Sequence, residues 1–213
     1  MTEYLTKLMQ RKGYSFNSTV DFEIVREMKE KMCYMSIDME RERKVALETC
    51  ALDQEFEYTL PDGKKAVVII GKERFEAPEI LMQPALFGAD FSDRAGMATM
   101  VFESIRACNP SNQKALANHI CLSGGTSMIP GLSTRLENEV KMCYVNDPKL
   151  GKGDKSINKR VPVNVVDPPR RKNAVFMGAS FVGGIAGEEM YIMRDNWLEE
   201  SEAGRKNMLV REL

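Results

Sequence analysis

The stretch Leu122-Ser123-Gly124-Gly125-Thr126-Ser127-Met128-Ile129-Pro130-Gly131 decides the fold of this 213-residue chain. Just before it, the apolar run from Ile120 to Leu122 predicts a short buried strand. The strand leads directly into paired glycines, Gly124 and Gly125. Glycine adopts backbone dihedrals closed to other residues and lets a ligand approach the main chain.

A helix is predicted directly after the glycines. Pro130 suits its first turn, and apolar residues then recur at helical spacing: Leu132, Leu136, Val140 and Cys143. Free N–H groups and the helix dipole favour an anion at such an N-terminus. The arrangement is typical of a phosphate- or nucleotide-binding loop, although glycines between a strand and a helix also serve as plain connectors.

Composition narrows the class of protein. With 43% hydrophobic residues the chain can bury a real core, and its net charge of -1 argues against general nucleic-acid binding. The five cysteines lie far apart without C-x-x-C spacing, and no signal peptide is recognisable, which predicts free thiols in the cytoplasm. The apolar run over residues 174–186 is too short to span a bilayer and predicts a packed helix, so no membrane role is expected.

The first residues predict a helix that begins without a cap. Leu5, Leu8 and Met9 share one helical face, and no capping residue precedes them. We therefore expect further polypeptide upstream of Met1.

The next helix is predicted from the capping residues Ser18 and Thr19 to about Cys33. Its expected buried stripe consists of Ile24, Val25, Met28 and Met32. A second face carries Arg26, Lys29 and Glu30. These charges fit a solvated face with an Arg26–Glu30 ion pair, or a site where Lys29 and Glu30 contact a base or ribose.

Three more elements complete the first half. A helix is predicted over residues 39–51. Strands over Phe56–Leu60 and Ala66–Ile70 form a hairpin, because Pro61-Asp62-Gly63 between them has the chemistry of a tight turn.

The second half alternates helix and strand, which predicts an α/β fold. One helix is expected to bury a face made of Met97, Met100, Val101, Ser104, Ile105 and Cys108. A strand is expected over Val161–Val166. The polar segment 144–160 contains Gly151-Lys152-Gly153-Asp154-Lys155-Ser156, which does not fit the P-loop pattern and predicts a surface insertion. The turn 167–172 carries a basic cluster that we expect to be solvated.

Catalytic constellations are not recognisable in the sequence. His119 is the only histidine, and no serine or cysteine nucleophile pattern surrounds it, so a structural role is expected. Metal-ligand spacings do not occur either. We predict no catalytic and no metal-binding residues.

Several collinear motifs resemble the C-terminal half of actin. They are Lys29-Glu30-Lys31-Met32-Cys33-Tyr34, Tyr58-Thr59-Leu60-Pro61-Asp62-Gly63, Glu73-Arg74-Phe75-Glu76-Ala77-Pro78-Glu79, the Leu122–Gly131 loop and Pro168-Pro169. The match covers essentially the whole chain. Asp21-Phe22-Glu23, the long 144–160 segment and the 167–172 turn are more similar to an actin-related protein than to conventional actin.

The resemblance implies an α/β, actin-like ATPase (ribonuclease H-like) fold, of which this chain is the C-terminal half without the phosphate-binding N-terminal subdomains. It implies a small subdomain over residues 1–89, a large subdomain of the same lobe over 90–173, and a piece of the opposite lobe over 174–213.

The resemblance also implies a nucleotide site. Arg26, Lys29 and Glu30 would line the adenosine side, and Lys172 would close on the base. The residues expected beneath the nucleotide are Gly124, Gly125, Thr126, Ser127, Met128 and Ile129. Ile129 stands where the family usually has tyrosine, so a ring contact is not expected there. ATP or ADP is the implied cofactor, with its magnesium held by the absent half.

The function implied is that of a subunit which, with actin-related protein 3, companion subunits and actin filaments, starts branched actin filaments in the cytoplasmic cytoskeleton. Half a nucleotide cleft is not expected to hydrolyse ATP, because orienting the attacking water needs the absent half. A divergent conventional actin is an alternative, as is a sugar-kinase or heat-shock ATPase of the same fold.

Overall fold

The computed structural model describes residues 1–60, 63–147, 162–187, 191–202 and 204. The chain divides into two compact units, Met1–Lys172 and Asn173–Leu213. Within the described ranges, no helix is both long and apolar enough to cross a membrane.

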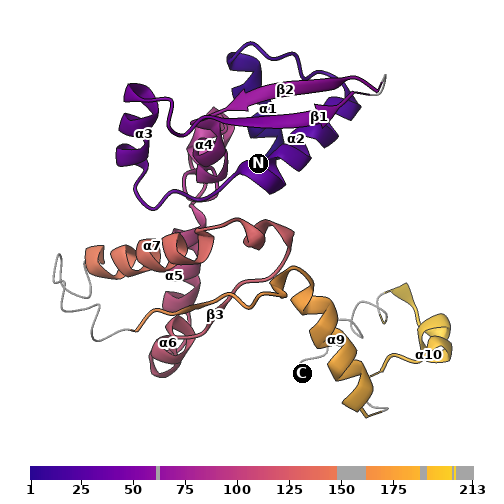
Figure 1. Cartoon of the computed structure of the whole chain (residues 1–213). Coiled ribbons are helices and arrows are strands. Elements are labelled where there is room, and N and C mark those ends of the chain that lie inside the picture. Colours follow the sequence, from indigo (N-terminus) through magenta and orange to yellow (C-terminus); the bar gives the residue numbers. More distant parts are fainter. Residues whose placement is uncertain (61–62, 148–161, 188–190, 203, 205–213) are drawn as a thin grey trace. The chain divides into compact units, whose positions relative to one another are not determined.

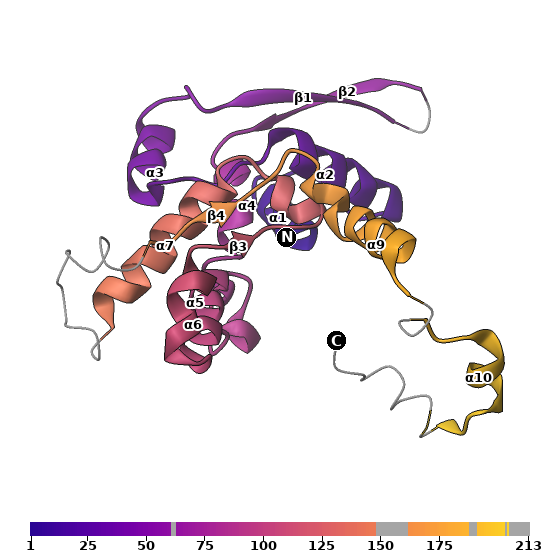
Figure 2. The ribbon, with the colours of Figure 1, turned by 90° about the horizontal axis from the view of Figure 1, so that it is seen from below.

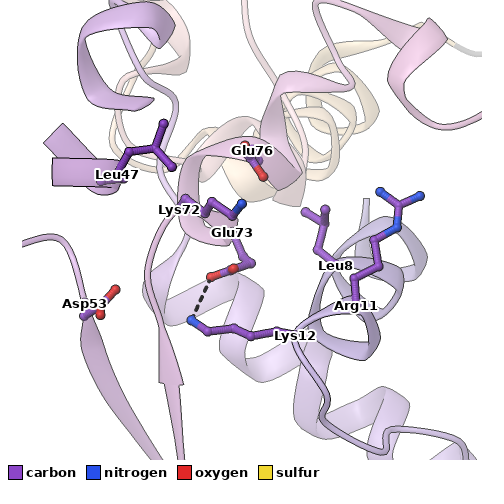
Figure 3. A pocket seen from close by; sticks show the side chains of 9 residues that line it. Leu8, Arg11, Lys12, Leu47, Asp53, Lys72, Glu73 and Glu76 are labelled. Atoms are coloured by element: carbon purple, nitrogen blue, oxygen red, sulfur yellow. Dashed lines mark hydrogen bonds and ion pairs between the residues drawn. The ribbon is translucent and has the colours of Figure 1, made fainter. Parts of the chain in front are cut away.

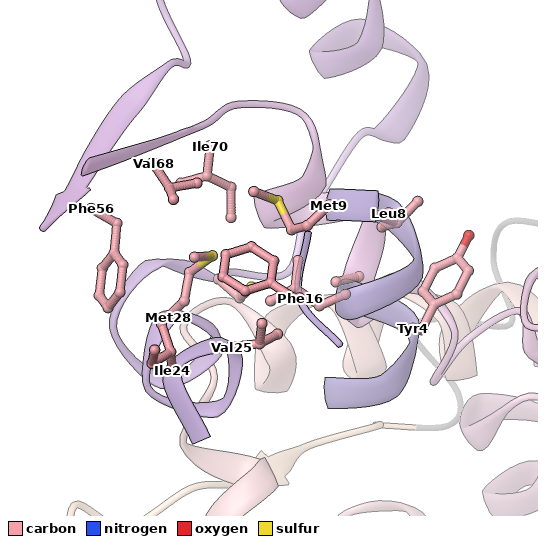
Figure 4. Packing of buried hydrophobic residues seen from close by; sticks show 13 residues of the cluster. Tyr4, Leu8, Met9, Phe16, Ile24, Val25, Met28, Phe56, Val68 and Ile70 are labelled. Atoms are coloured by element: carbon pink, nitrogen blue, oxygen red, sulfur yellow. The ribbon is translucent and has the colours of Figure 1, made fainter. Parts of the chain in front are cut away.

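The first core lies under a β-hairpin. Strands β1 (Gln54–Thr59) and β2 (Lys65–Ile70) run along helices α1 (Thr2–Arg11) and α2 (Thr19–Met32), and α4 (Glu73–Glu79) follows the hairpin (Figures 1 and 2). Figure 4 shows side chains from these elements converging between the hairpin and the helices. The members buried most completely are Leu5, Met9, Val25, Met28 and Ile70.

Helices α1 and α2 confirm the predicted patterns. Leu5, Leu8 and Met9 are all buried in α1. In α2 the Ser18 side chain accepts a hydrogen bond from the Asp21 N–H, and the Asp21 carboxylate accepts one from the Ser18 N–H, forming a capping box. The predicted stripe of α2 is buried except for Met32, which is half-buried against the edge of the core.

Helix α3 (Met39–Glu48) is shorter than predicted. Asp38 caps its first turn by accepting a hydrogen bond from the Arg41 N–H. The helix ends because Thr49 adopts an extended conformation, with φ -141° and ψ 154°. Every residue of α3 remains at least partly exposed, so no packing holds a further turn.

The hairpin confirms the predicted strands with small shifts at their ends. Phe56 pairs with Val68 in an antiparallel register that directs Phe56, Val68 and Ile70 into the core. Val67 and Ile69 point the other way and are exposed, as strand alternation requires. Of the predicted turn, Pro61 and Asp62 lie outside the described residues. Gly63 has φ +81° and donates its N–H to the Leu60 carbonyl oxygen at 2.9 Å.

The second core surrounds a parallel pair of very short strands. Strand β3 (Ile120–Cys121) pairs with β4 (Val165–Val166), so only the end of the predicted 161–166 strand is formed; Val161 itself lies outside the described residues. Helices α5 (Met97–Ala107), α6 (Pro110–Ala117) and α7 (Leu132–Asn146) complete this part. The buried members are Ala98, Ile105, Ala117, Leu136, Val140, Tyr144, Val163 and Val165.

The predicted buried face of α5 is partly wrong. Ile105 is buried, but Met100 is 58% exposed, and Ser104 and Cys108 are exposed as well. The helix packs against α7 on one side. Its other side borders an open apolar groove that also includes Leu116. Helical periodicity finds an apolar face but does not reveal whether this part of the chain covers it.

A buried ion pair joins the two cores. Arg135 of α7 donates from Nη2 to Glu79 Oε1 of α4 at 3.0 Å, and from Nη1 to the Ser36 carbonyl oxygen at 2.7 Å. The two charged side chains are 8% and 1% exposed. A small apolar cluster of Met35, Ile129 and Leu132 lies at the same junction.

The second unit contains the helix predicted over 174–186. Helix α9 (Ala174–Ile185) is followed by α10 (Arg194–Glu199). The large apolar side chains of α9 are exposed, including Phe176 at 77% and Ile185 at 84%.

Candidate functional site

The glycine loop forms a tight bend after strand β3. Gly124 has φ +98°, a left-handed conformation that other residues rarely adopt, and the 3-10 helix η3 (Gly125–Met128) follows it. The Ser127 hydroxyl donates to the Gly124 carbonyl oxygen at 2.6 Å, which closes the bend. A side chain added at Gly125 would meet no atom within 4 Å, so the outer side of the bend is open.

Pro130 does not lie in the helix, contrary to the prediction. Helix α7 begins at Leu132, and Gly131 precedes it in a left-handed conformation with φ +82°. A Cβ at Gly131 would lie 2.6 Å from the Met35 carbonyl oxygen. The Pro130 carbonyl oxygen accepts a hydrogen bond from the Met35 N–H at 2.8 Å, so Pro130 links the loop to the segment after α2 instead of starting a helix.

One cavity brings together residues from three distant segments. Its volume is about 450 Å³, and Lys29 and Glu30 of α2 form one part of its wall. The remaining lining residues are Gly125, Thr126, Met128, Ile129 and Lys172. Of the ten predicted site residues, the structure thus places seven around a single cavity.

The cavity wall combines opposite charges with an apolar surface. Lys29 is half-buried, whereas Glu30 and Lys172 are exposed. Ile129 is 7% exposed and packs in the junction cluster with Met35 and Leu132. The wall can therefore contact a flat apolar group while offering two cations and one carboxylate.

The other three predicted residues do not line the cavity. Arg26 forms an ion pair with Glu23, Nη2 to Oε2, at 2.6 Å, so the predicted pairing of Arg26 with Glu30 is wrong. Residues three and four positions apart are both neighbours on a helix surface, so the sequence alone does not decide between the two glutamates. Gly124 and Ser127 shape the bend instead: Gly124 supplies its positive φ, and the Ser127 hydroxyl donates to the Gly124 carbonyl oxygen.

Arg171 is a residue that the sequence interpretation missed. The predicted solvated cluster includes it, yet its side chain is only 12% exposed. Its Nε donates to the Ser127 carbonyl oxygen at 3.0 Å, and its own carbonyl oxygen accepts the Gly124 N–H at 3.0 Å. Nothing in the local sequence separates Arg171 from its neighbour Arg170, which is exposed.

Another cavity, of about 440 Å³, lies between α1, α3 and α4 (Figure 3). Three of its charged groups are engaged in ion pairs: Lys12 Nζ lies 3.3 Å from Glu73 Oε2, and Glu76 pairs with Arg43, which lies outside the cavity lining. None of the predicted site residues lines it. We therefore take the cavity beside the glycine loop as the candidate site.

The described residues hold no cluster of three or more His, Cys, Asp or Glu side chains suited to a metal ion. His119 is exposed, and its Nδ1 lies 3.1 Å from the Ala115 carbonyl oxygen. The structural role predicted for His119 fits this contact with the preceding helix.

The mixed order of helices and strands, with a glycine bend beside a cavity, defines an α/β protein, and comparison with known families identifies its class. The actin family model matches residues 2–207, so the chain belongs to the actin family. The predicted resemblance is confirmed, and with it an actin-like α/β fold.

The individual relatives are more specific. The chain is 44% identical to "Actin-related protein 2" of Arabidopsis thaliana over 202 residues, which cover 94% of this chain and 50% of the relative. It is 43% identical to "Actin-related protein 2" of Acanthamoeba castellanii, with 95% and 49% covered. The protein of the same name from Caenorhabditis briggsae is 41% identical, with 95% and 48% covered. The chain thus spans about half the length of the curated relatives that it matches.

Proposed function

We propose that this chain supplies the adenosine side of an ATP- or ADP-binding site in an actin-related protein. The observation that carries the proposal is the single cavity lined by Lys29, Glu30, the glycine loop and Lys172. These residues lie far apart in the sequence, and they are the ones that the family resemblance assigns to the nucleotide.

The chemistry of the wall suits the two parts of adenosine. The Glu30 carboxylate can accept hydrogen bonds from ribose hydroxyls. Met128 and Ile129 offer an apolar surface to the base, and the ammonium groups of Lys29 and Lys172 can lie over its π face or meet its ring nitrogens. Backbone N–H groups of the loop at Gly125 and Thr126 are suited to an anionic phosphate.

A titration of the isotope-labelled chain with ATP, followed by NMR, tests this proposal. With half of a site, we expect weak binding, with a dissociation constant of about 1 mM. The amide signals of Lys29, Gly125 and Thr126 should shift, while those of the first core stay in place.

Matched variants show whether charge at the cavity matters. Lys172→Ala should weaken ATP binding about fivefold, since it removes one contact from the wall. Lys44→Ala removes an exposed lysine of α3, far from the cavity lining, and should bind like the unmodified chain. Equal affinities for both variants, or no shifts in the unmodified chain, would overturn the proposal.

The chain by itself is not expected to hydrolyse ATP. Turnover requires a positioned water and charge neutralisation by a metal ion, and we assign the magnesium to a part of the protein outside this chain. Release of phosphate from ATP and Mg²⁺ by the purified chain, above the rate of an equally purified blank, would contradict this.

We further propose that the complete protein is a subunit of the complex that starts branched actin filaments in the cytoplasmic cytoskeleton. The support is the name "Actin-related protein 2" shared by its relatives, and the implied partners are actin-related protein 3, companion subunits and actin filaments. In this proposal residues 1–89 and 90–173 are the subdomains of one lobe, and 174–213 belong to the other.

Two alternatives can be distinguished by experiment. A divergent conventional actin would polymerise alone as a complete protein, whereas the proposed subunit would be recovered with actin-related protein 3 in a pulldown. Membership in the actin family argues against the other alternative, a sugar kinase or a heat-shock ATPase.

A further inference from the structure

Arg171 holds together the two backbone segments that border the candidate nucleotide cavity. Its guanidinium donates to the Ser127 carbonyl oxygen in the glycine loop. The same group donates from Nη1 to the carbonyl oxygens of Asp167 and Pro168, at 3.2 and 3.3 Å. The side chain thus spans the loop on one side and its own turn on the other.

The main-chain carbonyl group of Arg171 accepts two further hydrogen bonds from the beginning of the glycine loop. The Arg171 carbonyl oxygen accepts the Gly124 N–H at 3.0 Å and the Ser123 hydroxyl at 3.3 Å. The first and the last part of the bend are therefore both fastened to one residue. Lys172, the next residue along the chain, lies in the wall of the cavity.

We propose that Arg171 is a positioning residue for the nucleotide, which fixes the glycine loop and Lys172 at a set separation without touching the ligand itself. This inference rests on the proposed function of the cavity. Arg171 is not among its lining residues, whereas Lys172, Thr126 and Met128 are.

The geometry explains why an arginine is needed. Three carbonyl oxygens in different directions require several donors in a rigid fork, which guanidinium has and the ammonium of lysine lacks. The Asp167 carboxylate lies 4.0 Å from Nη1, at the limit of an ion pair, so the carbonyl contacts carry the role.

The contact with Ser127 also affects the next peptide N–H. In a trans peptide the C=O and N–H point in opposite directions. Fixing the Ser127 carbonyl oxygen toward Arg171 therefore fixes the direction of the Met128 N–H, and Met128 lines the cavity. Loss of the guanidinium would free this peptide to rotate.

The test compares the same substitution at neighbouring arginines in the whole chain. Arg171→Lys keeps the charge and removes the fork, whereas Arg170→Lys alters an exposed residue. We expect Arg171→Lys to weaken ATP binding about fivefold in the NMR titration and Arg170→Lys to leave it unchanged. A merely structural role would lower thermal stability and leave the affinity of the folded chain unaltered.

Hydrogen exchange supplies a second measurement that does not need ATP. The Gly124 and Ser127 amides of Arg171→Lys should exchange about tenfold faster than those of the unmodified chain, while the amides of the Val140 turn in α7 keep their rates. Wild-type rates at Gly124 and Ser127, or an affinity for ATP within twofold of the unmodified chain, would overturn the positioning role. Absence of any ATP binding by the unmodified chain would instead overturn the proposed function, and the exchange rates would still decide whether Arg171 holds the loop.

Discussion

The two cores of the first unit differ in how completely this chain covers them. The first core is enclosed between a hairpin of six-residue strands and two helices, and several of its side chains are fully buried. The second is built around strands of only two residues, and the apolar groove along α5 remains open. An antiparallel hairpin is formed by strands that are neighbours in the sequence. Parallel strands, in contrast, must come from segments that are well separated along the chain.

The largest expected effect concerns the thiols. Cys33 is buried at the end of α2, and burial raises its pKa to about 12, whereas Cys121 on β3 and Cys108 after α5 are exposed. Iodoacetamide needs a thiolate that it can reach, so Cys33 in the native chain should react on the order of a thousandfold more slowly than Cys121. Mass spectrometry of timed digests measures both rates. Equal rates would show that the first core is no better enclosed than the second.

The junction between the cores gives the next effect. Arg135→Ala leaves the Glu79 carboxylate buried without its partner and should lower the free energy of unfolding by about 3–5 kcal/mol in urea titrations. Lys141→Ala breaks a half-exposed pair with Glu137 on the same helix and should cost less than about 1 kcal/mol. If both variants lose the same stability, the junction does not join the cores.

The double variant Arg135→Met with Glu79→Leu separates the contribution of the buried charges from that of the hydrogen bond to the Ser36 carbonyl oxygen. It removes both buried charges and keeps the volume, so its unfolding free energy should return to within about 2 kcal/mol of the unmodified chain. A loss as large as that of Arg135→Ala would mean that the contact with the Ser36 carbonyl oxygen matters more than the charges.

Two methionines compare the cores directly. Met28→Ala creates a cavity in the first core, where Met28 is fully buried, and should cost about 3 kcal/mol. Met100→Ala, at the exposed edge of the second core, should change the unfolding free energy by less than about 0.5 kcal/mol. Chemical denaturation of both variants measures the difference, and equal losses of stability would show that the two cores are equally well enclosed.

The smallest effect is a pH dependence at the junction. Burial raises the pKa of Glu79 above its ordinary value near 4.5, although Arg135 acts against this shift. The folded chain then keeps a proton that the unfolded chain has lost, so the unfolding free energy falls as the pH rises from the ordinary value through the raised one. Glu79→Gln should abolish this part of the slope in urea titrations at several pH values. An unchanged slope would assign it to other groups.

Local signals predicted the first core well. The face of α1, the cap of α2 and the strands of the hairpin depend on neighbours within a few residues, and all three were found as expected. For the candidate site, the glycine loop and the Lys29–Glu30 pair were visible in the sequence. That they share a cavity with Lys172 depended on the family resemblance.

What the sequence did not reveal are contacts between distant residues. Arg135 and Glu79 lie on different helices, and Arg171 is indistinguishable from Arg170 by local pattern. The placement of Pro130 was wrong because the residue after it, Gly131, has a left-handed φ of +82°, and because Met35, far away in the sequence, donates to the Pro130 carbonyl oxygen. The exposure of Met100 could not be predicted because periodicity identifies an apolar face and not what covers it.

Gly131 has a consequence for how the chain tolerates mutation. Any other amino acid there would meet two penalties together, an unfavourable left-handed φ and a collision with the Met35 carbonyl oxygen. Relieving the collision requires the Met35 segment and the loop that carries Met128 and Ile129 to move apart, so a single substitution would loosen the contact at the junction between the cores. Variation at this position should therefore be much rarer than at Gly88, which has an extended φ and where a side chain would meet no atom within 4 Å.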